Sequence, residues 1–455
     1  MLENINALRK QILNLAYPAI ISNITVPLVG LVDIALVGRL GSAAYIGGVG
    51  FASVVFSFIY SGLGFLRMST NGLTAQAYGA SNFREANSIL IRAIILGVLS
   101  GLLLIALQTP LERLLISMFD SSPESLKYAS EYFYVRIYAT PASLAVIGFM
   151  GWFVGMQDTK TPMWVTLIIS LANIAFSLFF VIYFKMGVKG VALGTVVAQY
   201  LGLISSILFY VKKYKSYLSY IDKKSILKFD EIKKFFNISK DIFVRSILLT
   251  GSFFLFNIVS ADFGDEILAL NSVMLQFLWF FSYFADGFAN AGGSIAGKYK
   301  GAANPKLLKE TIKESLRLGL LVAIIFSVVY VFFSKQIVQI LTDDVQVISL
   351  FETYHFWVWL IPITGFAAFI YDGIYIGITE SKIMRNVMII SILIIYVPLL
   401  FLAKHYIGNH GMWAVLILML LTRGIGLKVQ LKVKSDALNV VEVLKVEPSL
   451  RAHRR

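Results

Sequence analysis

The sequence has no cysteine and few charged residues. Of its 455 residues, 15% are Asp, Glu, Lys or Arg and 58% are hydrophobic, whereas ordinary soluble domains are roughly 25% charged. Without thiols the chain can form no disulfide, thiolate metal site or iron–sulfur cluster. This composition excludes a water-soluble multidomain enzyme and indicates a polytopic helical membrane protein.

Long apolar runs recur from one end of the chain to the other. Each run is long enough, at about 1.5 Å per residue, to cross roughly 30 Å of hydrocarbon. We therefore predict an all-α integral membrane fold with twelve spans. The predicted limits are 12–37, 43–75, 89–110, 128–154, 162–184, 188–211, 241–262, 267–297, 312–334, 346–378, 385–404 and 411–430.

The two halves of the sequence are related by a shift of 221 to 222 residues. Gly79-Ala80-Ser81-Asn82 recurs as Gly301-Ala302-Ala303-Asn304, and Ile168-Ile169-Ser170 recurs as Ile389-Ile390-Ser391. Each half holds six spans, so both halves enter the membrane in the same orientation and the repeat is parallel. In transporters built from such repeats, the substrate binds between the two lobes.

The basic residues predict an orientation. With the N-terminus in the cytoplasm, 29 of the 40 Lys and Arg residues lie on that side and seven on the other, which is the positive-inside pattern. Topology thus accounts for most of the +14 net charge, and nucleic acid binding is not needed to explain it. We predict a monomeric inner-membrane protein with both termini in the cytoplasm.

The predicted spans and the distribution of basic residues divide the chain into four parts. We predict an N-lobe at 1–211, a basic cytoplasmic linker at 212–240, a C-lobe at 241–430 and a basic cytoplasmic tail at 431–455. The linker interleaves lysines with aromatic residues, which is typical of a segment that lies on anionic lipid headgroups.

Asp33 is an ionisable residue inside the first predicted span. Such a group costs at least about 2.5 to 3.5 kcal/mol on insertion scales, so its presence needs an explanation. Pro18 and Pro27 break the same span and allow the helix to bend. Two interpretations stay open: Asp33 reaches water at the outer interface, or it responds to protons or sodium and faces the cavity of the N-lobe.

Uncharged polar residues recur at one-turn spacing in the fifth and sixth spans. Asn173 and Ser177 share one helical face, and Thr195 and Gln199 share another. Side chains of this kind often hydrogen-bond one membrane helix to the next. With a carboxylate they would instead form an all-oxygen nest for a hard cation, so a weak sodium site near Asp33, Asn173 and Thr195 is the alternative.

Three further charged residues lie deep in predicted spans. The repeat shift places Asp286 on Gly64 and Asp372 on Met150, so these carboxylates are not part of the duplicated scaffold. We predict that they serve the cavity of the C-lobe, with a role in helix packing as the alternative. Arg67 is predicted to be either a counter-ion for a carboxylate or an anchor that snorkels to the interface.

Catalysis finds no support in the sequence. The phosphate-binding pattern GxxxxGK[ST] is absent, which excludes ATP-driven transport by this chain. We therefore expect no cofactor, and an ion gradient as the source of energy. The four histidines lie at loop edges or in the tail, without metal-ligand spacing: His355, His405, His410 and His453.

Several strings resemble the multidrug and toxic compound extrusion (MATE) transporters, and in particular their DinF-like bacterial branch. The most specific are LVDIALVGRLG, FLRMSTNGLTAQAYGA, GMQDTKTP, FADGFANA and YDGIYIGITESKIMRN. The resemblance covers nearly the whole chain. It implies twelve helices in two six-helix lobes and an antiporter that exports organic, often cationic, compounds.

The resemblance also implies roles for residues of the N-lobe. Asp33 matches the first-helix aspartate that takes the coupling proton or sodium, and Pro18 matches a proline associated with bending of that helix. Asn173 and Thr195 match positions of the N-lobe cation network. Ser177 stands where the family commonly has a second carboxylate, which favours protons over sodium as the coupling ion.

In the C-lobe, the resemblance places Asp286 and Asp372 at the DG motifs of the eighth and tenth helices. Gly293 stands where a glutamate is frequent. We predict a cation-coupled antiporter that works by alternating access. The rival is a flippase for lipid-linked saccharides, which would need a strongly cationic cavity; a membrane enzyme or sensor would need a metal, a nucleophile or a soluble domain.

Overall fold

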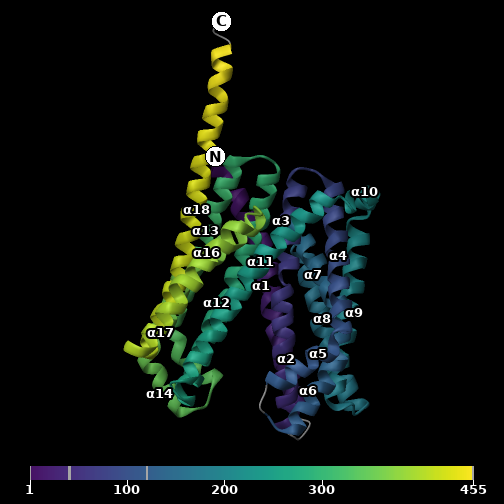
Figure 1. Ribbon diagram of the computed structural model, residues 1–455, viewed down its shortest axis with the longest axis vertical. Coiled ribbons are helices and arrows are strands. Elements are labelled where there is room, and N and C mark those ends of the chain that lie inside the picture. Colours follow the sequence, from purple (N-terminus) through teal and green to yellow (C-terminus); the bar gives the residue numbers. More distant parts are fainter. Residues whose placement is uncertain (1, 39–42, 119–120, 453–455) are drawn as a thin grey trace.

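The computed structural model describes residues 2–38, 43–118 and 121–452, and every regular element in these ranges is a helix (Figure 1). The helices of the first half are α1 (Leu2–Gly38), α2 (Ala43–Leu63), α3 (Phe65–Gly79), α4 (Phe83–Ala106), α5 (Gln108–Met118), α6 (Pro123–Arg136), η1 (Ile137–Ala139), α7 (Thr140–Gly155), α8 (Lys160–Leu178), η2 (Phe179–Tyr183) and α9 (Gly187–Lys213).

The second half begins after two short connecting helices, η3 (Lys215–Tyr220) and α10 (Lys223–Ile226). Its helices are α11 (Phe229–Ala261), α12 (Asp265–Gly301), α13 (Pro305–Leu341), α14 (Val345–Tyr354), α15 (Phe356–Gly377), α16 (Ser381–Ile389), η4 (Ile390–Tyr396), α17 (Val397–Tyr406) and α18 (Asn409–Ala452).

The predicted all-α membrane fold is confirmed. Eleven stretches of the described residues are long and apolar enough to cross a membrane, and α1, with 37 residues, has the length of a twelfth span. The expected interruption of the first span is wrong, because α1 stays one helix through Pro18 and Pro27. The span expected at 43–75 is two helices that meet at Gly64.

Equivalent helix ends confirm the repeat. Helix α3 ends at Gly79 and α12 at Gly301, and the next helix begins at Phe83 or Pro305. The intervening turns contain residues with positive φ at equivalent positions, Ser81 at 54° and Ala303 at 50°. Asn82 and Asn304 then cap the following helices through their side-chain oxygens.

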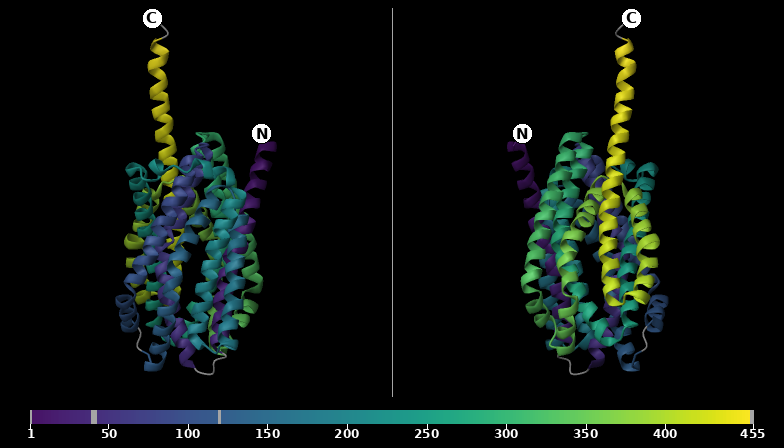
Figure 2. Two further views of the ribbon diagram at one scale, coloured as in Figure 1. Left: turned by 90° about the vertical axis from the view of Figure 1, so that its right-hand side faces the viewer. Right: turned by 90° about the vertical axis from the view of Figure 1, so that its left-hand side faces the viewer.

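The helices form two bundles, α1–α9 and α11–α18 (Figure 1), and both termini lie at the same end of the molecule (Figure 2). We call this end the termini side. The expected boundaries differ in detail: α11 begins at Phe229, inside the predicted linker, and α18 continues as a helix through the predicted tail.

The lobes share buried apolar residues on the termini side. One cluster contains Leu73 and Phe149 from the first half together with Phe288 and Ile374 from the second. Two other clusters lie toward the opposite side, and the buried residues of each come from a single lobe. The lobes are therefore packed together at one end and have separate cores at the other.

Candidate functional site

Asp33 lies near the end of α1, and its Oδ1 atom is buried without a hydrogen-bond partner. Arg136, the last residue of α6, interacts with it electrostatically, although the described residues show no ion pair between them within 4 Å. The Arg136 guanidinium donates to the Tyr132 hydroxyl at 2.8 Å and lies 4.8 Å from the centre of the Phe56 ring. A fixed positive charge thus stands near an incompletely bonded carboxylate.

The sequence predicts Asp33 as the main titrating group of the N-lobe but does not identify Arg136 as its neighbour. The sequence does mark Arg136 as unusual, because it is one of four arginines inside or at the end of a predicted span, with Arg67, Arg245 and Arg423. An arginine in such a place usually has an acidic or backbone partner.

The uncharged polar residues of the N-lobe meet at the contact of α8 with α9. Asn173 Nδ2 donates to Thr195 Oγ1 at 2.9 Å, and Thr195 Oγ1 and Ser177 Oγ both donate to the Val191 carbonyl, at 3.3 and 3.4 Å. The Asn173 Oδ1 atom is buried without a partner. These contacts join two helices, and no carboxylate hydrogen-bonds to this group in the described part of the chain.

Asp372 in α15 is bound by two arginines. Arg245 from α11 and Arg423 from α18 both donate to its Oδ2 atom, the latter at 2.7 Å. All three side chains are nearly inaccessible, with Arg423 only 1% exposed. Asp372 therefore connects three helices of the C-lobe, and neither of its partners is predicted from the sequence.

Arg67 and Asp286 face each other across the lobes. Arg67 lies on α3 and Asp286 on α12, and the two charges attract one another. The Asp286 carboxylate also feels the charges of Arg245 and Arg423. Within 4 Å the described residues form no ion pair with either side chain. This arrangement supports the counter-ion role predicted for Arg67.

Helix α1 contacts both lobes in the stretch between its two prolines. Ser22 Oγ donates to Thr166 Oγ1 of α8 at 2.8 Å, and Asn23 Nδ2 donates to the Tyr283 carbonyl of α12 at 3.0 Å. A change in the bend of α1 at Pro18 or Pro27 would thus alter a contact between the lobes.

Two glutamines hold the lobes together on the termini side. Gln76 of α3 donates from Nε2 to the Gly377 carbonyl at 3.0 Å and to Thr379 Oγ1 at 2.8 Å. Gln157, after α7, donates from Nε2 to the Ser294 carbonyl and hydroxyl of α12, at 3.0 and 2.6 Å. We call these four contacts the glutamine latch.

Glycine allows the backbones to approach each other beside the latch. A Cβ atom on Gly79 would lie 1.8 Å from the Lys298 carbonyl oxygen, and one on Gly301 would lie 2.0 Å from that of Gln76. Farther from the termini side, the described residues also join the lobes through the Ser61 and Thr250 hydroxyls, which lie 3.0 Å apart. The lobes are therefore closed at the termini side.

The turns after α7 and α15 each contain an acidic residue that forms an ion pair with a lysine outside the membrane spans. Asp158 accepts from Thr161 Oγ1 at 2.6 Å, Lys213 Nζ at 2.7 Å and Tyr214 Oη at 3.0 Å. Burial acts to raise the pKa of Asp158, but the bonds and charge of Lys213 and Thr161 hold it below its ordinary value. Glu380, its repeat equivalent, pairs with Lys300 at 3.1 Å.

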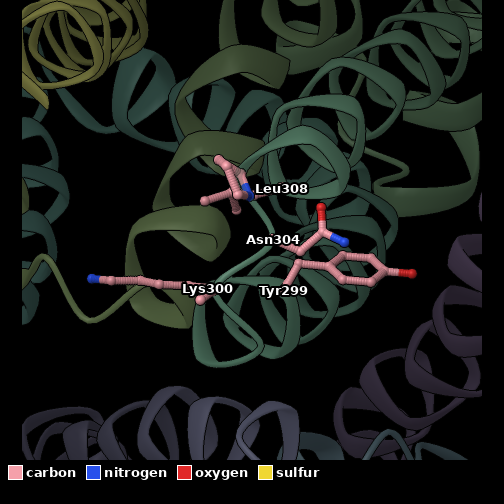
Figure 3. A pocket seen from close by; sticks show the side chains of 6 residues that line it. Tyr299, Lys300, Asn304 and Leu308 are labelled. Carbon is pink, nitrogen blue, oxygen red and sulfur yellow. The ribbon is translucent and has the colours of Figure 1, made fainter. Parts of the chain in front are cut away.

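A small pocket at the turn between α12 and α13 is separate from these charged groups. Tyr299, Lys300, Asn304 and Leu308 are among the residues that line it, and the side chains of Tyr299 and Lys300 point in opposite directions (Figure 3). Asp286 lies thirteen residues before Tyr299 on the same helix, which is about 20 Å along the axis. This pocket therefore does not belong to the embedded carboxylates.

Comparisons with known proteins agree with this architecture. The MatE family profile matches residues 18–179 and 242–402, one block in each lobe. The DNA damage-inducible protein F of Escherichia coli (strain K12) is 34% identical over 418 residues, which cover 92% of this chain and 91% of that protein. A probable multidrug resistance protein NorM of Thermotoga maritima is 31% identical over 215 residues, 46% of this chain and 45% of that protein.

A solved structure shows the same fold. It is described as the outward-facing conformation of a multidrug resistance MATE family transporter of the MOP superfamily, and it superposes with a TM-score of 0.86 at 19% identity over 95% of this chain and 96% of its own. From the sequence matches and the two-lobed helical fold together, the chain belongs to the MATE family of multidrug and toxic compound efflux transporters.

Proposed function

We propose that this transporter is a secondary active antiporter that exports amphipathic organic compounds in exchange for protons. The observation that carries the proposal is the environment of Asp33, a membrane-embedded carboxylate that accepts no hydrogen bond from the described residues, whereas Asp372, which also has one unpartnered buried oxygen, is bonded through the other to two arginines. A carboxylate in this state can gain a proton without breaking an existing bond. Its protonation would change the charge balance with Arg136 and the packing of α1.

Alternating access requires two arrangements of the lobes. The glutamine latch and the shared apolar cluster support the assignment of this structure to the arrangement that is closed on the termini side. We infer that the termini side is cytoplasmic, since 29 of the 40 Lys and Arg residues lie there. The protein would then occupy the inner membrane, as a monomer, in its outward-open state.

The energy of one proton is sufficient for export. A proton moving inward down about 100 mV and one pH unit releases roughly 3.7 kcal/mol. This sustains a gradient of a few hundred-fold for a neutral substrate. Sodium is the alternative coupling ion, but Asn173, Thr195 and Ser177 have no carboxylate bonded to them, so they offer a hard cation no charged ligand.

The proposed coupling role is tested by drug efflux in everted vesicles. We expect Asp33→Asn to abolish proton-driven accumulation, and Asp344→Asn, at an exposed helix cap on the opposite side, to leave it intact. Proton-driven efflux that survives in Asp33→Asn would show that the coupling carboxylate is elsewhere. The same vesicles, assayed with and without sodium at fixed pH, test the choice of ion.

A second candidate is export of anionic amphiphiles, such as lipid-linked saccharides. The sequence disfavours this candidate because embedded arginines are few. In the structure, three of them, Arg67, Arg245 and Arg423, gather around Asp286 and Asp372, so positive charge is in excess there. A transport screen that pairs cationic dyes with bile salts of similar size would separate the two candidates.

A further inference from the structure

The connection between the lobes exposes large apolar side chains. Leu227 and Phe229 are 73% and 74% exposed, and Phe236 on the next turns of α11 is 51% exposed. Tyr220 and Ile221, at the end of η3, are also exposed. Together these five residues form what we call the linker surface. Apolar side chains this exposed are unfavourable in bulk water, so the surface needs a partner.

The linker is held against the side of the N-lobe. The Arg92 guanidinium of α4 donates from Nε to the Ile226 carbonyl at 2.9 Å and also to the Ser225 carbonyl, while Asn87 donates to the Tyr217 carbonyl. Glu85 pairs with Arg92 at 2.6 Å and fixes its orientation. The linker is therefore a docked element of defined position.

These contacts set the height of the linker in the membrane. Asn87 and Arg92 lie four and nine residues after the start of α4 at Phe83, which is about 6 and 14 Å along the helix. Figure 1 places α10 at the outer edge of the N-lobe, beside α4. The linker thus lies at the rim of the bundle, at the depth where hydrocarbon meets headgroups.

Positive charge surrounds the same surface. The segment 211–240 holds nine lysines and three acidic residues. Two of the acids already have partners, since Asp222 pairs with Arg84 at 3.6 Å and Glu231 with Lys234 at 4.0 Å. Apolar anchors at the interface, ringed by exposed lysines, are complementary to a bilayer surface with negative headgroups.

We propose that the linker surface binds the cytoplasmic leaflet, with Leu227 and Phe229 among the upper acyl carbons and the surrounding lysines on anionic phospholipid headgroups. A protein partner would not require Leu227 and Phe229 to lie at the depth of the bilayer surface. Because α4 holds Ser225 and Ile226 and Phe229 is the first residue of α11, this contact would attach the connection between the two lobes to the leaflet.

The absence of native cysteine makes a direct test possible. Full-length Leu227→Cys protein carrying a fluorophore is reconstituted in phosphatidylcholine vesicles with nitroxide-labelled phosphatidylglycerol or, separately, nitroxide-labelled phosphatidylcholine at equal mole fraction. We expect the anionic quencher to be more effective by about two-fold or more. Ile340→Cys, an exposed position on the opposite side, should show quenching without this preference.

Charge-removal variants separate the lysines from the apolar anchors. Lys228→Gln with Lys233→Gln should abolish the preference for the anionic quencher at position 227, while Lys185→Gln with Lys189→Gln, on the opposite side, should preserve it. Equal quenching by both lipids would overturn the headgroup assignment. No quenching by either lipid would mean that water or protein covers the linker surface. Neither readout depends on transport, so failure here is distinct from failure of the proposed antiport.

Discussion

The two lobes surround their embedded carboxylates in different ways. Asp33 in the N-lobe has an oxygen without a hydrogen-bond partner, and Arg136 acts on it only through space. Asp372 in the C-lobe accepts direct hydrogen bonds from Arg245 and Arg423 and connects three helices. The repeat therefore supplied a common scaffold on which the embedded carboxylates have different surroundings: Asp372 is bound in an ion network, whereas Asp33, like Asp286, forms no ion pair within 4 Å among the described residues.

Removal of one arginine from the fixed network should have the largest effect on stability. Arg423→Leu would leave the network around Asp372 with a partly uncompensated buried charge, which costs about 3–5 kcal/mol. Equilibrium unfolding in detergent measures the loss. Arg113→Leu, at an exposed arginine, is the matched control. A small effect in Arg423→Leu would contradict the view that the C-lobe site is structural.

Neutralisation of Asp33 should change stability little and transport strongly. Asp33→Asn is expected to change the free energy of unfolding by about 1 kcal/mol or less, because no hydrogen bond is lost. The same variant should lose proton-driven accumulation, up to a few hundred-fold. Unfolding and vesicle accumulation are measured on one preparation, and a large loss of stability in Asp33→Asn would break the comparison between the lobes.

Weakening of the latch should increase the population that is open on the termini side. Each removed hydrogen bond contributes about 1 kcal/mol net, and each glutamine makes two, so Gln76→Ala or Gln157→Ala should increase opening roughly 30-fold. The labelling rate of Ser69→Cys, a buried position that contacts Ser239 of the other lobe, reports this opening. Gln346→Ala, at an exposed residue on the opposite side, should leave the rate unchanged; equal rates in all variants would argue against a latch.

The smallest expected effect concerns Asp158, which, unlike the embedded aspartates, has a repeat equivalent. Its pKa is lower in the folded protein than in the unfolded chain, so its stabilisation is present above the unfolded pKa near 3.9 and is lost as the pH falls through the folded pKa. Because Lys213 is half exposed, the pair contributes about 1 kcal/mol or less.

The corresponding measurement compares wild type with Lys213→Met over a pH series. The difference in unfolding midpoint between the two proteins should be constant near neutral pH. It should shrink as the pH is lowered toward the pKa of Asp158. A difference that stays constant down to acid pH would mean that the Asp158–Lys213 pair does not provide the stabilisation.

Much of the architecture could be predicted from the sequence, because apolar length and repeat spacing are properties of the chain itself. The spans followed from hydrocarbon thickness, and the repeated strings that begin at Gly79 and Gly301 form equivalent turns, in which Ser81 and Ala303, each two residues later, have positive φ. The continuity of α1 through Pro18 and Pro27 was missed, since a proline in a membrane helix can be accommodated by its packing against neighbouring helices.

The sequence by itself determined the helical fold, the number of spans, the duplication and the presence of embedded charges. Only the tertiary structure decided which charges meet, because Arg245, Asp372 and Arg423 come together from helices separated by 51 to 127 residues along the chain. Pairing of that range depends on how helices pack, which hydropathy does not record. The same packing left Asp33 without a hydrogen bond or ion pair among the described residues, and for this reason we propose Asp33, and not Asp372, as the coupling carboxylate.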